Sequence, residues 1–425
     1  MTLSSELTLP CGARIPNRLA KAAMTEGLAE PGGIAGERIV RAYTAWAQGG
    51  AGLILTGNMM VDRRYRERPA NVVVEGEQSA NALKGLERFA AAAKSGGAVA
   101  LAQISHAGRQ SPRSVAPEPV GPSAVAVKLP GGLYAKPRAL TAGEIAGIIG
   151  RFAHTARTLV EAGFDGVQIH AAHGYLISEF LNPRVNRRED EWGGSLENRA
   201  RLLVETVRAV RAAIGADRVL AVKLNSSDFQ KGGFSFEDCL QVVDLLDAEG
   251  IDLLEISGGS YEQPRMMGLD GLEPVLEENV RASTRAREAY FMGYAAQVIA
   301  RAKTPVMVTG GFRTRAAMEA AVEEGVAVIG IGRPLCVDPD APKKLLASEI
   351  EALDAFETRL RVGPGIFGPH SRLAVMKAVN GLATMAFFYR NIIRMAEGKP
   401  TLREMNLLGT LIAHQRQEAQ DAKRI

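Results

Sequence analysis

Three side chains that can hold or move a proton stand close together near the middle of the sequence. They are His170, His173 and Tyr175, in the stretch IHAAHGY that ends a short apolar run. If that run is a buried strand, its carboxyl end places all three at one rim of a sheet. Two imidazoles there can donate hydrogen bonds to one substrate oxygen, and a phenol beside them can deliver a proton. The stretch therefore predicts a catalytic site that polarises an oxygen atom and protonates a neighbouring atom.

The histidine pair also allows two other interpretations. A His-x-x-His pair can bind a metal ion, and His106, after an earlier apolar run, is a possible third ligand. Metal-ligating carboxylates are not evident at the other strand ends, which argues against this interpretation. The histidines could instead be hydrogen-bonded loop residues without a chemical role. We favour the catalytic interpretation and expect no metal ion.

Glycines follow two apolar runs near the end of the repeating part of the chain. Gly310 and Gly311 occur in TGGF, and Gly332 occurs in GIGR, directly before Arg333. Glycine N–H groups can approach phosphate oxygens closely, and an arginine can donate two parallel hydrogen bonds to them. Either motif alone would be an ordinary turn, but together they predict a phosphate site. Because no G-x-G-x-x-G or Walker motif is present, we expect a mononucleotide cofactor.

Two polar residues lie inside apolar runs that should be buried. Lys223 interrupts the run VLAVKL, and Gln103 stands in ALAQI. A buried lysine needs a negative partner. For Lys223 that partner is either the anionic edge of a reduced flavin ring or a neighbouring carboxylate, for which Glu255 is the candidate. Gln103 could contact the ring edge or satisfy a hydrogen bond in the core.

These residues belong to a unit that recurs along the chain: an amphipathic helical stretch, a glycine, and a short aliphatic run. Glycines that can end a helix precede most of the runs. Strands joined by helical crossovers form a parallel sheet, and eight such units predict a closed (β/α)₈ TIM barrel. The eight runs cover residues 18–24, 51–57, 98–104, 166–171, 218–224, 251–257, 304–310 and 326–332.

Long connections after strands 3 and 4, over residues 107–140 and 174–195, are expected to form walls of the active site, together with a shorter one over 260–282. The chain beyond the barrel is predicted to be helical. We divide the protein into a barrel over residues 1–347 and a C-terminal helical extension over 348–425. The extension is expected to pack on the barrel or on a partner subunit, and in the second case its helices would form the contact of a homo-oligomer. A lid over the site is the alternative.

Composition narrows the class of function. The chain has 425 residues, 46% of them hydrophobic, and 51 Lys and Arg against 47 Asp and Glu. The weak excess of positive charge is dispersed, so we expect neither nucleic acid nor a membrane surface as a partner, and small-molecule chemistry is favoured. Three separated cysteines argue against a disulfide framework or an iron–sulfur cluster. No signal peptide or membrane span is evident, which indicates a cytoplasmic protein.

The stretch HAAHGYLISEFLNPRVNRREDEWGGSLENRARLL, residues 170–203, closely resembles the signature of the Old Yellow Enzyme family of FMN-dependent ene-reductases. The resemblance covers roughly residues 7–340, including QISHAGRQ at 103–110 and GGFRTRAAMEAAVEEG at 310–325. It implies a (β/α)₈ barrel that holds FMN non-covalently, is reduced by NAD(P)H and is reoxidised by activated alkenes. It also implies that His170 and His173 hold the substrate carbonyl and that Tyr175 is the proton donor.

The resemblance further implies a set of FMN-binding residues. Those around the ring and ribityl chain are Ala23, Met24, Thr25, Gly57, Gln103 and Lys223, and those at the phosphate are Gly310, Gly311, Gly332 and Arg333. Two positions depart from common members: Thr25 stands where one branch has cysteine, and Lys223 where many have arginine. The extension beyond residue 348 has no counterpart that can be matched.

We therefore expect an FMN-dependent oxidoreductase that uses NAD(P)H to reduce the activated C=C bond of enone-type substrates by a ping-pong hydride transfer. A metal-dependent barrel hydrolase or lyase is the first alternative. A flavoprotein that serves mainly as a redox-responsive binding partner, with the C-terminal helices as its contact surface, is the second.

Overall fold

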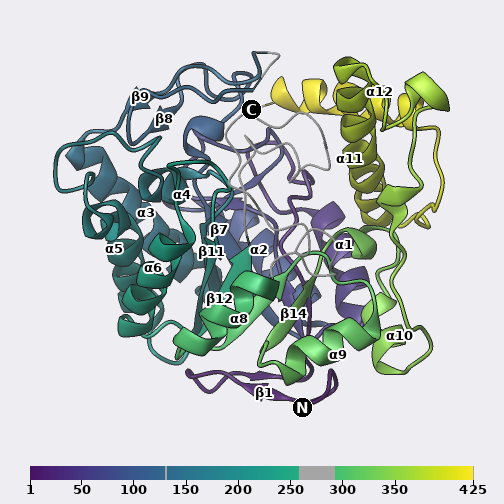
Figure 1. The fold of residues 1–425 in the computed structure, drawn as a ribbon, viewed down its shortest axis with the longest axis horizontal. Helices are drawn as coiled ribbons and strands as arrows, with labels where there is room; N and C mark the ends of the chain where they lie inside the picture. Colours follow the sequence, from purple (N-terminus) through teal and green to yellow (C-terminus); the bar gives the residue numbers. More distant parts are fainter. Residues whose placement is uncertain (130–131, 258–291, 425) are drawn as a thin grey trace.

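Eight parallel strands form a closed ring at the centre of the structure, a computed structural model that describes residues 1–129, 132–257 and 292–424 (Figure 1). Each of the eight predicted runs coincides with one of them, although β7 and β11 each extend one residue beyond the predicted run. In chain order they are β3 (Leu19–Lys21), β4 (Leu53–Leu55), β7 (Val99–Ser105), β10 (Gly166–Ala171), β11 (Val219–Asn225), β12 (Leu253–Ser257), β13 (Val306–Thr309) and β14 (Val328–Ile331).

Pairing between neighbouring strands closes the ring. The order runs from β3 through β4, β7, β10, β11, β12 and β13 to β14, and β14 pairs again with β3, all in parallel. Two short strands, β5 (Met59–Met60) and β6 (Val72–Val73), extend the sheet beside the end of β7. The predicted (β/α)₈ barrel is confirmed.

Helices cover the outside of the ring (Figure 1). The connections between strands contain α1 (Glu37–Gln48), α2 (Ala80–Lys94), α3 (Ala142–Glu161), α5 (Leu196–Ile214), α6 (Phe236–Ala248), α8 (Met292–Arg301) and α9 (Arg315–Glu323), and α10 (Ala341–Leu346) follows β14. Six glycines that end helices before strands have φ between +67° and +104°. This left-handed conformation is open to glycine because it has no Cβ. The six are Gly50, Gly97, Gly163, Gly215, Gly250 and Gly325.

Two buried apolar layers hold the barrel together. The larger lies between the strands and the helices, and the smaller fills the inside of the ring with side chains such as Leu101, Ala221 and Met307. An antiparallel hairpin of β1 (Leu7–Thr8) and β2 (Arg14–Ile15) packs Leu9 and Ile15 against the inner layer. Because the hairpin lies at the amino ends of the strands (Figure 1), the carboxyl ends remain for chemistry.

The two predicted long connections lie at the carboxyl ends of β7 and β10. The first contains only the short 3₁₀ helix η1 (Gly108–Gln110) and the paired strands β8 (Val120–Gly121) and β9 (Arg138–Ala139) among its described residues. The second contains one helix, α4 (Leu176–Leu181). The third predicted wall, 260–282, lies outside the described residues.

The C-terminal extension differs in part from the prediction. Its described residues before position 374 form no α-helix and contain only the 3₁₀ turns η4 (Phe356–Thr358) and η5 (Gly365–Phe367), in a stretch interrupted by Gly363, Pro364 and Gly365. Helix α11 (Ala374–Ala396) packs against α1 and buries Phe387 in the layer shared with the barrel, and α12 (Leu407–Ala422) packs against α11 (Figure 1). The division into two domains stays a prediction.

Across the described helices, none combines the length and the apolar character that a membrane crossing requires.

Candidate active site

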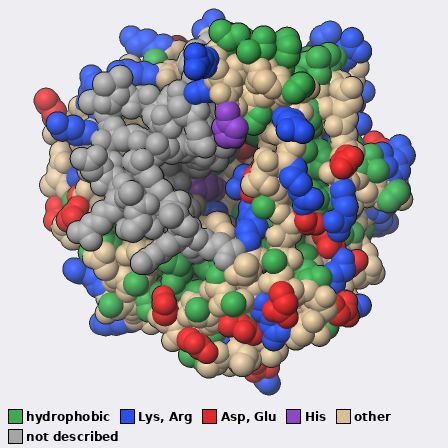
Figure 2. Space-filling view, turned by 45° about the vertical axis from the view of Figure 1, so that its right-hand side comes forward, with side chains coloured by type: hydrophobic (Ala, Val, Ile, Leu, Met, Phe, Trp, Pro, Cys, Tyr) green, Lys and Arg blue, Asp and Glu red, His purple; other side chains and the backbone are tan. Residues whose placement is uncertain are grey.

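His170, His173 and Tyr175 come together at the carboxyl end of β10, as the sequence predicts. The ring of His170 meets the rings of His173 and Tyr175 edge to face, with centroids 5.1 Å and 4.7 Å apart. His170 and Tyr175 are buried, whereas His173 is partly exposed. Three proton-bearing groups therefore share one compact cluster. The space-filling view in Figure 2 labels no residue, and on the face that it draws, histidine, Lys and Arg side chains border a hollow.

The backbone after β10 turns sharply to present this cluster. His173 has φ of +62°, a left-handed conformation that is uncommon for a residue with a side chain, and Gly174 follows with φ of +78°. The N–H of His173 donates to Asn225 Oδ1 at 3.1 Å, from the end of β11. The ring Nε2 of His173 lies 2.8 Å from Ser257 Oγ, at the end of β12. The sequence analysis did not single out Asn225 or Ser257, although both are polar residues that end apolar runs.

Both imidazoles are neutral at physiological pH. Burial lowers the pKa of His170 well below its usual value, and the neighbouring His173 and Lys223 lower it further. Burial, together with Lys223, also lowers the pKa of His173 well below the usual range. Because the N–H of Ala172 donates to His170 Nδ1 at 3.2 Å, the ring proton of His170 belongs on Nε2. His170 can therefore donate a hydrogen bond through Nε2 as an uncharged ring.

His106, the possible third metal ligand, has a separate environment. Its Nδ1 accepts from the N–H of Gly108 at 3.1 Å, and its ring lies against that of Tyr65, with centroids 5.2 Å apart. Burial lowers its pKa to about 4. Within residues 1–129, 132–257 and 292–424, no three His, Cys, Asp or Glu side chains meet in a group that could hold a metal ion.

Lys223 forms the ion pair that the sequence analysis gave as its alternative. Its Nζ lies 2.8 Å from Glu255 Oε1, and the side chains of both residues are at most 4% exposed. The second oxygen of Glu255 accepts from Gln168 Nε2 at 2.7 Å. Gln168 in turn accepts from Gln103 Nε2 at 2.7 Å, so Gln103 also has a partner in the core.

The end of β3 carries the next group of candidate cofactor residues. Ala23 packs beside the inner apolar layer, and Met24 Sδ lies 3.5 Å from Cys336 Sγ. Thr25 Oγ1 donates to Glu67 Oε2 at 2.7 Å, and Asn58 Nδ2 donates to the same oxygen at 2.6 Å. Glu67 was not predicted, because nothing in its local sequence indicates a contact with Thr25.

Gly57, at the end of β4, is fixed by two residues from other elements. Its N–H donates to Glu26 Oε1 at 2.8 Å and to the Tyr43 hydroxyl at 3.0 Å, and Tyr43 donates to Glu26. A Cβ at Gly57 would stand 2.4 Å from Glu26 Oε2 and from the carbonyl oxygen of Met24, closer than any real contact. The close approach of Glu26 therefore explains the glycine without reference to a ligand.

The candidate phosphate residues lie together at the ends of β13 and β14. Gly310 and Gly311 have φ of +116° and +83°, and Gly332 directly precedes the 3₁₀ helix η3 (Arg333–Cys336). The Arg333 side chain is half-exposed, and its Nη2 lies 3.5 Å from Glu357 Oε1 of the extension. Arg313 also pairs with Glu357. The candidate phosphate site thus has glycine backbone without side chains in the way, two arginines, and the carboxylate of Glu357 beside them.

The residues present fit a polar ligand in the barrel mouth. Twelve buried side-chain polar atoms have no hydrogen-bond partner among the described residues, and five of them belong to residues at or just after the carboxyl ends of strands. Buried polar groups are normally paired. The five are Asn58 Oδ1, Ser105 Oγ, His106 Nε2, Ser226 Oγ and Thr309 Oγ1, of which His106 lies in the separate environment described above. A flavin mononucleotide, with a polar ring edge, a hydroxylated chain and a phosphate, has the groups to meet such atoms.

Arg68, which belongs to the barrel, contacts three residues of the C-terminal extension. The guanidinium carbon lies 3.8 Å from the centre of the Tyr389 ring, and Arg68 Nη2 lies 2.8 Å from Glu418 and 3.1 Å from His414 Nε2. These three partners come from α11 and α12. Arg68 directly follows Glu67 in the sequence, and Glu67 accepts a hydrogen bond from Thr25, one of the candidate flavin-binding residues. The extension therefore contacts the residue next to one that fixes the candidate flavin site.

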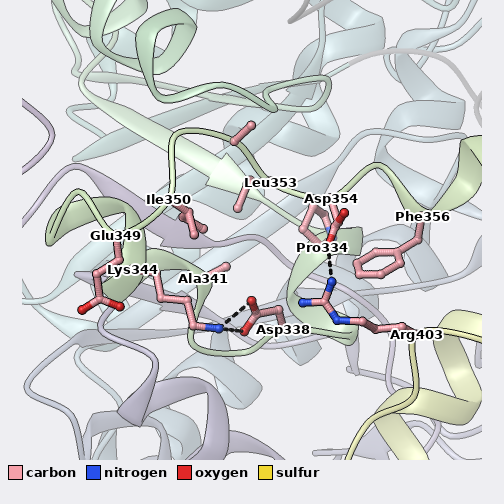
Figure 3. Close-up of a pocket in the computed structure, with 11 residues that line it drawn as sticks. Pro334, Asp338, Ala341, Lys344, Glu349, Ile350, Leu353, Asp354, Phe356 and Arg403 are labelled. Carbon is pink, nitrogen blue, oxygen red and sulfur yellow. Dashed lines mark hydrogen bonds and ion pairs between the residues drawn. The ribbon is translucent and has the colours of Figure 1, made fainter.

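A separate cavity of about 310 Å³ lies between η3, α10 and the segment that follows α10 (Figure 3). Four of the five charged residues that line it form two ion pairs. Lys344 binds Asp338 at 2.8 Å, and Arg403 binds Asp354 at 2.6 Å. None of the predicted site residues lines it.

Comparison with known proteins agrees with the barrel fold. Residues 11–351 match the model of the NADH:flavin oxidoreductase / NADH oxidase family. The NADH-dependent flavin oxidoreductase iliE of Hypocrea jecorina is 37% identical over 374 residues, which cover 83% of this chain and 91% of that protein.

Two solved structures show the same likeness. An old yellow enzyme homologue from Zymomonas mobilis has a TM-score of 0.68 and 27% identity, covering 84% of this chain and 96% of its own. A 2-naphthoyl-CoA reductase, in complex with 2-naphthoyl-CoA, has a TM-score of 0.73 and 27% identity, covering 83% of this chain but only 53% of its own. The chain therefore belongs to the NADH:flavin oxidoreductase / NADH oxidase family and is an FMN-dependent oxidoreductase of the Old Yellow Enzyme type.

Proposed function

We propose that this enzyme uses NAD(P)H to reduce the activated C=C bond of α,β-unsaturated carbonyl compounds in two separate half-reactions. The observation that carries the proposal is the cluster of His170, His173 and Tyr175, in which two neutral imidazoles and a phenol meet at one strand end. A bound FMN supplies the hydride in this chemistry. The protein must then hold the substrate oxygen and provide the proton.

His170 is the better placed of the two oxygen-binding residues. Its Nε2 carries the ring proton, because Nδ1 accepts from Ala172. A neutral donor polarises a carbonyl oxygen without the cost of burying a charged ring. His173 Nε2 lies 2.8 Å from Ser257 Oγ, and in the tautomer that carries its proton on Nε2, His173 would donate a second hydrogen bond to a substrate oxygen that displaces the Ser257 hydroxyl.

Tyr175 delivers the proton to Cα of the alkene in this proposal. Its ring is 2% exposed and is fixed by the edge of His170 and by packing on Met60, Val73 and Ala107. A phenol held in one position by such contacts can act as a general acid on a substrate whose oxygen is bound next to it. Gly310, Gly311, Gly332 and Arg333 would bind the cofactor phosphate, and Ala23, Met24, Thr25, Gly57, Gln103 and Lys223 would lie around the ring and ribityl chain.

The test separates the two half-reactions under anaerobic conditions. The flavin absorbance should bleach when NADH or NADPH is added without an alkene, and it should recover when 2-cyclohexenone is added afterwards. The product should be cyclohexanone in an amount equal to the bound flavin. Bleaching that requires the alkene to be present would contradict a ping-pong order, and no recovery with any simple enone would contradict the substrate class.

A further inference from the structure

A continuous row of buried polar side chains crosses the inside of the barrel. Gln103 on β7 donates to Gln168 on β10, Gln168 donates to Glu255 on β12, and Glu255 pairs with Lys223 on β11. The heavy-atom distances are 2.7, 2.7 and 2.8 Å. None of the four residues is more than 3% exposed. Such a fully connected buried network is rigid and fixes the orientation of each member.

Strand register explains why these residues meet. Gln103 is paired with Gln168, and Lys223 is paired with both His170 and Glu255 across neighbouring strands. Side chains two residues apart in a strand point to the same face, so Gln168 lies one layer below His170. The ends of the row, Gln103 and Lys223, are the two residues of the row that the proposed function places against the flavin.

The carboxylate of Glu255 has both oxygens engaged. Lys223 occupies Oε1 and Gln168 occupies Oε2, so the positive charge of Lys223 is compensated before any ligand is considered. A flavin ring that accepts a hydride gains one negative charge. An isolated lysine cation beside the ring would favour that reduced form, whereas the adjacent carboxylate opposes it.

We propose that Glu255 is a positioning residue that sets how strongly Lys223 favours the reduced flavin. Glu255 fixes Nζ of Lys223 in one place and offsets its charge. Through Gln168 it also fixes the amide of Gln103, because one N–H of that amide donates to Gln168 and sets which way the amide group faces. This inference rests on the placement of Lys223 and Gln103 at the ring in the proposed function.

The experiment is a measurement of the two-electron reduction potential of the FMN-loaded enzyme, with redox mediators and without any alkene. Glu255→Gln keeps the shape and an acceptor for Lys223 but removes the negative charge. We expect the equilibrium constant for reduction to rise at least tenfold, which is about 30 mV for a two-electron couple. A potential equal to that of the wild type would overturn the inference.

Asp252→Asn is the matched control. Asp252 directly precedes β12, three residues before Glu255, and pairs with Arg211 at 2.6 Å near the amino end of the strand. The same carboxylate-to-amide change about 10 Å along the strand should leave the potential unchanged. An equal shift in Asp252→Asn would show a general effect of charge and would also overturn the role of Glu255.

A second pair of variants covers the case in which Glu255→Gln fails to fold, because removing one partner of a buried ion pair is costly. Lys223→Met alone should lower the potential, and Lys223→Met combined with Glu255→Gln should raise it again relative to Lys223→Met. Equal potentials in these two variants would contradict the inference. Because no substrate is used, an enzyme that fails to reduce enones but shows these shifts would refute the proposed substrate and retain the role of Glu255.

Discussion

The buried imidazoles of His170 and His173 predict a specific loss of stability in mild acid. The pKa values of both rings are lowered in the folded protein, mainly by burial and by the charge of Lys223. In the unfolded chain a histidine titrates at about 6.5. Below that pH the unfolded state binds protons that the folded state does not, so the free energy of unfolding falls as the pH falls from about 6.5 toward the lowered pKa values.

The size of the effect follows from the width of this window. At pH 5.5, one unit below the unfolded pKa, a ring that stays neutral in the folded state lowers the free energy of unfolding by about 1.4 kcal/mol. His170 is buried and should contribute nearly all of this amount. His173 is partly exposed and should contribute less because of solvent screening. We expect a combined loss of about 1.4 to 2.7 kcal/mol relative to pH 7.5.

The assay is urea unfolding at pH 7.5 and 5.5, with saturating FMN, for the wild type and for the double variant His170→Asn/His173→Asn. Other titrating groups, including the FMN phosphate and His106, are common to both proteins and cancel in the comparison. The wild type should lose about 1.4 to 2.7 kcal/mol more than the double variant between the two pH values. An equal loss in both proteins would refute the conclusion that the imidazoles are buried in the neutral form.

Three further predictions concern other parts of the site. Tyr175→Phe should slow flavin reoxidation by an enone by about 10²- to 10⁴-fold and leave flavin reduction by NAD(P)H unchanged in stopped-flow measurements; equal rates in both half-reactions would remove its role as proton donor. Arg333→Gln should weaken FMN binding by about 10- to 100-fold in fluorescence titrations, because a charged hydrogen bond to phosphate contributes about 1.5–3 kcal/mol. Glu357→Gln should strengthen FMN binding, because Glu357 competes with the phosphate for Arg333. Affinity changes in the same direction for both variants would contradict this. Arg68→Met should increase amide hydrogen exchange in α12, where Glu418 loses its partner, and unchanged exchange would show that the contact does not hold the helix.

The sequence was sufficient for the barrel because its strands are buried on both faces and are therefore continuous apolar runs. Glycines that end helices marked most of the boundaries, and their positive φ values agree with that role. The first part of the extension could not be predicted in the same way. Residues 348–373 have no repeating unit, and their 3₁₀ turns depend on contacts such as the burial of Phe356.

The same distinction applies to the site. His170, His173 and Tyr175 were predictable as a cluster because they are close in sequence. Glu255 was a candidate partner for Lys223 because the two residues occupy corresponding positions in consecutive strands, which pair in parallel. The contact of Thr25 with Glu67 joins residues 42 positions apart, and Arg68 contacts Glu418 from 350 positions away. Such contacts depend on the tertiary fold and leave no local signal in the sequence.

The most direct test of the central claim, that FMN lies in the barrel mouth against the paired imidazoles, is a spectral titration of the oxidised enzyme with a phenol such as 4-hydroxybenzaldehyde. A phenolate stacked on the flavin and held by His170 and His173 should give a saturable long-wavelength absorption band. That band should disappear in His170→Asn/His173→Asn while the bound FMN remains. A band of equal strength and affinity in the double variant, or its absence from the FMN-loaded wild type, would contradict the account.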